Sequence, residues 1–138
     1  MNDDFKSVAE ELPQGIRVLI ADDTYVNVML MRSILKRLNI EFDSAVNGAK
    51  ALELLNKNNY DLVLTDISMP VMDGIELTRH IRNHPNPKIQ NLPVVVLTGS
   101  NKTEAAERIK DVGVTDCLFK PFKQNDFIEM IRRNLIKY

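Results

Sequence analysis

The sequence predicts an α/β fold in which a doubly wound parallel sheet of five strands carries helices on both faces. From Ile16 onward, short β-branched runs alternate with longer segments of helical period, and this alternation is typical of successive βα units. The strongest runs are apolar at nearly every position, as are strands that a parallel sheet buries on both faces. A length of 138 residues fits one such domain.

Five strands are predicted from these runs. The first is the most continuously apolar, whereas the second is weaker and is expected at an edge of the sheet. In chain order, the predicted strands span residues 17–21, 41–45, 62–65, 94–97 and 117–119.

Five helices are predicted after these strands, each from apolar residues three or four positions apart. The fourth has the thinnest apolar stripe, so we expect it to pack less firmly than the others. The stripes, in order, are Val26, Leu30, Ile34 and Leu38; Ala49, Leu52 and Leu55; Ile75, Leu77 and Ile81, within a helix over residues 74–83; Ala105, Ala106, Ile109 and Val112; and Phe127, Ile128, Ile131 and Leu135.

Proline, glycine and polar residues mark the segments between these elements. Residues 84–93 contain three prolines and are predicted to be a loop. Asn101 and Glu104 resemble a pair that caps the start of the fourth helix, and Gly113 is suited to end it.

The polar and acidic start of the chain predicts a separate segment. Residues 1–15 are expected to be a loosely held leader or the remnant of a linker, and the folded domain is expected over residues 16–138.

Composition narrows the classes of function. With 44% hydrophobic and 27% charged residues, the chain is typical of a globular protein with one core. A net charge of -1 argues against nucleic acid or an anionic membrane surface as the partner. The sequence contains no run of about 18 apolar residues, so no membrane-spanning segment is predicted. Cys117 is the only cysteine, which excludes an intramolecular disulfide and suits the reducing cytoplasm.

Polar residues are predicted at the carboxyl ends of four strands. Ligands of a doubly wound sheet bind at this edge, so we expect these side chains to converge. A single aspartate there usually caps a helix, but five polar residues together indicate a site. They are Asp22 and Asp23 after the first strand, Asp66 after the third, Thr98 after the fourth and Lys120 after the fifth.

The chemistry of this set favours phosphoryl transfer. Three carboxylates in one crevice repel one another unless a cation neutralises them, and oxygen ligands favour a hard ion such as Mg²⁺. A lysine and a hydroxyl at the same point supply the positive charge and the hydrogen bond that a phosphoryl group needs. Asp66, on the central strand, is then the best nucleophile, and Asp22 with Asp23 anchors the metal.

Four segments carry a resemblance to a known family: LIADD at residues 19–23, DLVLTDISMPVMDG at 61–74, LTG at 97–99 and FKPF at 119–122. Together they resemble the receiver domains of response regulators in two-component signalling, over almost the whole chain after Ile16. The resemblance implies a flavodoxin-like (βα)5 fold with strand order 2-1-3-4-5.

The resemblance also implies roles for individual residues. The domain would be a signalling phosphoacceptor that promotes its own phosphorylation and dephosphorylation, and not an enzyme with a separate substrate. Asp66 would accept the phosphoryl group from a partner phosphohistidine; Asp22, Asp23, Asp66 and the main-chain carbonyl of Ser68 would position Mg²⁺; and Thr98 and Lys120 would bind the phosphoryl oxygens.

Partners follow from the same likeness. The phosphodonor would be a sensor histidine kinase or a histidine phosphotransfer protein, and Asn27 is similar to the pattern in receivers of hybrid kinases, which indicates a phosphorelay. A downstream protein would bind the face formed by the fourth helix, strand 117–119 and the last helix. The chain departs from the family at Cys117, where Tyr or Phe commonly acts as a rotamer switch, and at Gly99, where Ala is frequent.

Three other functions remain open on the sequence. A flavodoxin-like nucleotide binder would carry flavin, although the acidic turn at Asp22 and Asp23 would repel its phosphate. A phosphatase with an aspartyl intermediate would turn over small phosphoesters repeatedly. An adaptor that docks by shape alone would bind its partner unchanged after Asp66→Asn.

Overall fold

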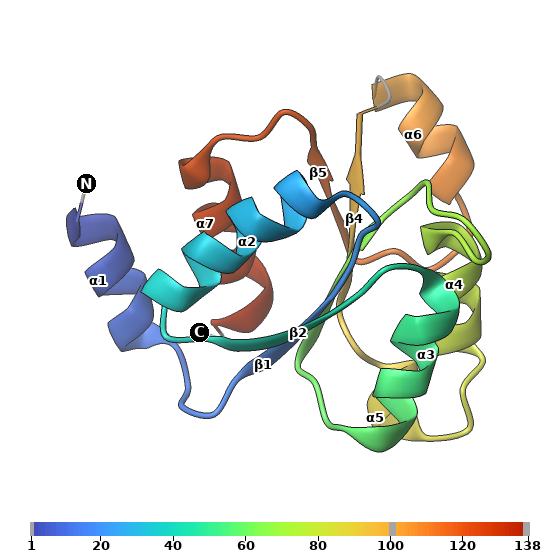
Figure 1. Ribbon diagram of the computed structural model, residues 1–138, viewed down its shortest axis with the longest axis horizontal. Helices are drawn as coiled ribbons and strands as arrows, with labels where there is room; N and C mark the ends of the chain where they lie inside the picture. Colours follow the sequence, from blue (N-terminus) through green and yellow to red (C-terminus); the bar gives the residue numbers. More distant parts are fainter. Residues whose placement is uncertain (1, 100–101, 137–138) are drawn as a thin grey trace.

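Five parallel strands form the central sheet of the computed structural model, in the order β2-β1-β3-β4-β5 (Figure 1). The structure describes residues 2–99 and 102–136. This order confirms the expected fold, and the last three strands are each one residue longer than predicted. The strands are β1 Arg17–Ala21, β2 Glu41–Ala45, β3 Leu62–Asp66, β4 Val94–Thr98 and β5 Asp116–Phe119.

Burial of the strands follows their place in the sheet. Every residue of β3 and β4 is buried, and Arg17 is the only residue of β1 that is not. In β2, which lies at the edge as predicted, only Ala45 is buried. The continuous apolar runs therefore mark strands covered on both faces.

Helices cover both faces of the sheet (Figure 1). One apolar core joins the sheet to α1, α2 and α7, a second joins it to α3, α4 and α5, and a smaller third lies under the end of α6. None of the helices in the described part of the chain is long and apolar enough to cross a membrane. The helices are α1 Asn2–Glu11, α2 Tyr25–Arg37, α3 Gly48–Lys57, α4 Gly74–Arg82, α5 Pro87–Gln90, α6 Lys102–Ile109 and α7 Gln124–Leu135.

The predicted apolar stripe of α2 is wrong in its first half. Val26 is 72% exposed and Leu30 is 46% exposed, whereas the buried face is formed by Met31, Ile34 and Leu35. An α-helix has 3.6 residues per turn, so a row of residues four apart drifts around the helix and leaves the core. Two of the four predicted residues therefore lie on the surface.

The loop predicted over residues 84–93 contains a short helix, α5. Pro87 occupies its first turn, where a missing N–H costs nothing, and the Asn86 side chain caps it by accepting a hydrogen bond from the Lys88 N–H at 3.0 Å. The side chain of Arg82 donates hydrogen bonds to the backbone on the far side of this helix, at Gln90 and Leu92. Pro87 thus begins a helix here, although the prolines of this segment were expected to prevent one.

The expectation that residues 1–15 are loosely held is also wrong. Most of the segment is the helix α1, and Phe5, Val8 and Leu12 are buried in the core shared with α2 and α7. These three residues lie on one face of the helix. Their helical spacing is hard to recognise in the sequence because polar residues lie between them. The assignment of residues 1–15 as the remnant of a linker stays a prediction.

α6 is held as weakly as its stripe suggested. Within the helix only Ala105 is buried, and Ala106 is exposed. The prediction that Gly113 ends this helix is wrong, because α6 ends at Ile109 and Gly113 lies in the turn that follows, in a left-handed conformation at φ 97°. The predicted cap at Asn101 lies outside the described residues. Cys117, the single cysteine, is half-buried.

Candidate functional site

Three carboxylates meet where β1 and β3 end. Asp66 is the last residue of β3, and Asp22 and Asp23 directly follow β1, which pairs with β3 up to Ala21. One oxygen of each carboxylate lies within 4.8 Å of one oxygen of the other two. Asp22 and Asp66 are buried and Asp23 is exposed, so the cluster opens to solvent on one side.

Of the three carboxylates, Asp22 has the environment that most disfavours its ionised form. Its Oδ1 accepts a hydrogen bond from the Thr24 N–H at 2.8 Å, whereas its buried Oδ2 accepts none from the residues that the structure describes. Burial raises the pKa of Asp22 and the charge of Asp66 adds to this, while Thr24, Lys120 and Asn27 act against it. Asp22 therefore has one buried oxygen that no hydrogen bond from the described residues satisfies.

Lys120 brings the compensating charge. Its Nζ lies 3.1 Å from Oδ2 of Asp66, and both side chains are largely withdrawn from solvent, with 24% and 8% exposed. The other oxygen, Oδ1, faces the N–H of Ser68 at 3.3 Å. Both oxygens of Asp66 therefore have a donor, one cationic and one from the backbone.

Thr98 reaches the same edge as the last residue of β4. It is fully buried, its strand pairs with β3, and its carbonyl accepts a hydrogen bond from the Lys120 N–H at 2.8 Å. The sheet thus brings the backbone of Thr98 and the side chain of Lys120 to the edge where Asp66 lies.

The segment after Asp66 is held close by Gly74. Its N–H donates to the carbonyl of Ile67 at 3.1 Å, and a Cβ at this position would overlap the carbonyl oxygen of Asp66. Asp73 caps α4 by accepting from the Glu76 N–H at 2.8 Å. The sequence shows Asp73 and Gly74 as a pair suited to a turn, and it does not show that Gly74 packs against the backbone of the site.

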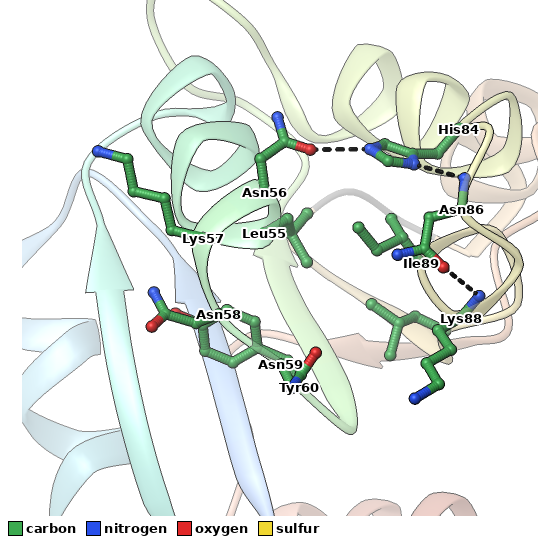
Figure 2. Close-up of a pocket in the computed structure, with 11 residues that line it drawn as sticks. Leu55, Asn56, Lys57, Asn58, Asn59, Tyr60, His84, Asn86, Lys88 and Ile89 are labelled. Atoms are coloured by element: carbon green, nitrogen blue, oxygen red, sulfur yellow. Dashed lines mark hydrogen bonds between the residues drawn. The ribbon is translucent and has the colours of Figure 1, made fainter.

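A polar hollow elsewhere is distinct from this cluster. Its volume is about 270 Å³, and Figure 2 shows it between the end of α3 and the α4–α5 region, where His84 is hydrogen-bonded to Asn56 at 2.8 Å. Its lining includes Tyr60 and Leu92, which precede β3 and β4, so it lies at the amino end of the strands. None of the predicted site residues lines it.

Residues 18–132 match the family described as response regulator receiver domain. The chain is a response regulator receiver domain. This family membership confirms the expected phosphoacceptor function in two-component and phosphorelay signalling.

Similar proteins include receivers within larger signalling kinases. The chain is 36% identical over 129 residues to hybrid signal transduction histidine kinase B of Dictyostelium discoideum, and 38% identical over 110 residues to the sensor protein EvgS of Escherichia coli K12. These matches cover 86% and 80% of this receiver domain. The chain spans only 7% and 9% of those two proteins.

Solved structures share the fold. The chemotaxis protein CheY4 of Vibrio cholerae has a TM-score of 0.80 at 28% identity, covering 87% of this receiver domain and 98% of its own chain. The receiver domain of sensor histidine kinase PA1611 from Pseudomonas aeruginosa has a TM-score of 0.79 at 28% identity, covering 87% and 97%. That Pseudomonas receiver has a magnesium ion coordinated in its active site cleft.

The contact at Gly74 predicts that Gly74→Ala destabilises the domain by about 3 kcal/mol, because the added methyl group must displace the Asp66 carbonyl. Gly99→Ala is the matched control. No atom of the described residues, its chain neighbours apart, lies within 4 Å of the Cβ position of Gly99, so we expect a change within about 0.5 kcal/mol. Urea unfolding of both variants measures the difference, and equal stabilities would contradict the proposed overlap.

The environment of Asp22 predicts a pH-dependent gain from Asp22→Asn. The folded-state pKa lies above the ordinary value of 3.8, so the ionised carboxylate opposes folding, increasingly as the pH rises through the folded-state pKa. In metal-free buffer at pH 7, the variant should be more stable than the wild type by about 1–2 kcal/mol.

Urea unfolding between pH 4 and pH 8 tests this, and the gain should shrink as the pH falls toward 4. A variant that is less stable at pH 7, or a gain that ignores pH, would rule the explanation out.

Proposed function

We propose that Asp66 is the phosphoacceptor of this receiver domain and that Thr98 and Lys120 bind the transferred phosphoryl group. The observation that carries the proposal is the 3.1 Å contact between Lys120 and Asp66 at the mouth of the acidic cluster. A cation and a hydroxyl at one edge can hold phosphoryl oxygens while the carboxylate reacts.

The step is a transfer from nitrogen to oxygen. An oxygen of Asp66 forms a bond to phosphorus while the bond between phosphorus and the donor histidine nitrogen breaks, and the electron pair of that bond stays on the imidazole. The product is an acyl phosphate on Asp66. Lys120 then faces a phosphoryl oxygen as well as the carboxyl group, and the Thr98 hydroxyl donates a hydrogen bond to another phosphoryl oxygen.

Mg²⁺ is the cofactor that the donor set fits. Asp22, Asp23, Asp66 and the main-chain carbonyl of Ser68 would hold it, and the buried Oδ2 of Asp22 is an oxygen without a hydrogen bond from the described residues. When bound, the ion offsets the negative charge that the phosphoryl group brings into the acidic cluster. This oxygen-only set also agrees with the magnesium ion in the Pseudomonas receiver.

The phosphodonor is a sensor histidine kinase or a histidine phosphotransfer protein. The kinase relatives support this, and so does an apolar surface that immediately follows the acidic pair on α2. We name this surface the α2 patch; its exposed fractions are 75% for Tyr25, 72% for Val26, 41% for Met29 and 46% for Leu30. Exposed apolar residues that border a reactive group favour docking of the protein that delivers the phosphoryl group.

Phosphorylation changes the face formed by α6, β5 and α7, and a downstream protein binds there. α6 is the least firmly packed of the longer helices, and a small apolar cluster joins Ile67, which follows Asp66, to Val112 beyond the end of α6. A shift around Asp66 can therefore reach α6 through direct packing. The domain promotes its own phosphorylation and dephosphorylation, and works in the cytoplasm, where Cys117 stays reduced.

The proposal predicts one phosphoryl adduct, on Asp66, after incubation with acetyl phosphate and Mg²⁺. Intact-mass and peptide mass spectrometry should detect it in the wild type and in Asn59→Glu, an exposed substitution far from the cluster, but not in Asp66→Asn. Removal of the metal with EDTA should abolish it. No adduct under conditions that modify another receiver would sink the proposal.

The α2 patch predicts a selective defect in Val26→Glu. Transfer from a histidine phosphotransfer protein that phosphorylates the wild type should slow by about tenfold, because a charge enters the apolar contact. Reaction with acetyl phosphate should be unchanged, since that donor needs no docking surface. Asn59→Glu serves as the control, and equal losses with both donors would place the defect in the site instead.

A further inference from the structure

The helix α1 is an addition to the shared receiver fold. The family match begins at residue 18, after α1 has ended at Glu11. The match to the CheY4 structure covers 98% of the CheY4 chain but only 87% of this one. CheY4 therefore completes the receiver fold without a counterpart for the remaining residues of this chain. In Figure 1, α1 lies at the outside of the molecule beside α2 and α7.

α1 fills a groove between α2 and α7. Phe5 and Val8 of α1 and Leu12, which directly follows it, are 4%, 2% and 9% exposed and belong to one core with residues of both helices. Their spacing of three and then four residues is that of an amphipathic helix laid in a groove.

Two arginines flank this groove. The guanidinium of Arg37, from α2, lies 3.7 Å from the ring centroid of Phe5, and the guanidinium of Arg132, from α7, lies 3.9 Å from the carboxylate of Glu11. Arg132 also lies 3.6 Å from the carboxylate of Glu129 on α7, so it shares its charge between that residue and Glu11. The groove therefore matches an apolar stripe that carries an aromatic ring beside Arg37 and a negative charge near its carboxyl end beside Arg132. This is the chemistry of an acidic amphipathic helix.

The connection of α1 to the sheet allows it to leave. A helix of ten residues is too short to be stable alone in water, so its order depends on the groove. Pro13, Gln14 and Gly15 join it to the core at Ile16 and are all exposed, and Gly15 adopts a left-handed conformation at φ 78°. Undocking would therefore break few contacts of β1.

We propose that the α2–α7 groove is a docking site for an acidic amphipathic helix of a partner protein, and that α1 is its built-in competitor. α2 begins three residues after Asp22 and α7 begins four residues after Lys120, so the groove joins the two helices that lead away from the site. A partner must displace α1 before it can bind, which makes the interaction weaker than the groove alone would allow.

The test uses the full chain with Phe5→Asp and Val8→Asp, which opens the groove, and a fluorescent peptide of residues 1–14 with the wild-type sequence as the probe. Fluorescence anisotropy should show saturable binding to this variant and about tenfold weaker binding to the wild type, whose groove is filled. Adding Arg37→Glu to the variant should weaken binding by about fivefold. The same peptide with both aspartates should not bind.

The chain with Lys6→Asp and Ser7→Asp is the matched control, because both residues are exposed on α1 and their substitution leaves the groove filled. It should bind the peptide no better than the wild type. Equal binding to the opened variant and the wild type would overturn the proposal. So would light scattering that shows two chains exchanging their α1 helices, since the groove would then serve self-association.

Hydrogen exchange of the wild type gives a second measurement, which stands even if the opened variant does not fold. The amides of α1 should exchange faster than those of α2 and α7 while β3 stays protected, because α1 undocks without global unfolding. Protection of α1 equal to that of β3 would show that the helix does not leave its groove, and would overturn the proposal.

Discussion

Three negative charges held within 4.8 Å of one another are the constraint on which this domain depends. Charges this close repel, and the fold tolerates them because Lys120 lies against Asp66 and because Asp23 faces solvent. Asp22 has less relief, and its raised pKa records the cost of burying it beside Asp66. The metal and the phosphoryl group of the proposed function would each restore the balance of charge at this edge.

A rigid sheet makes this arrangement possible. Because β1 and β3 pair up to Ala21 and are buried at nearly every position, their ends cannot move apart to separate the charges. The close approach of Gly74 to the backbone of Asp66 fixes the segment that follows. The unfavourable contacts are thus confined to the ends of strands whose apolar packing holds them in place.

The site could be predicted from the sequence because its residues sit at fixed places in a βα pattern. Once the strands are recognised, their carboxyl ends must meet at one edge, and the positions of Asp66 and Lys120 follow from topology. Periodicity was less informative where it was short or mixed with polar residues. α1 was missed because Phe5, Val8 and Leu12 are separated by charged and small residues, and half of the α2 stripe was misplaced because spacing alone does not say which side of a helix faces the core.

The open space at Gly99 affects the lifetime of the phosphorylated state. Its own chain neighbours apart, no atom of residues 2–99 and 102–136 lies within 4 Å of where its side chain would begin, directly beyond the buried Thr98. Gly99 has no side chain to cover an acyl phosphate formed on Asp66, so water could approach phosphorus past this position. The phosphorylated state would then be short-lived, and the output of the domain would follow the supply of phosphodonor closely.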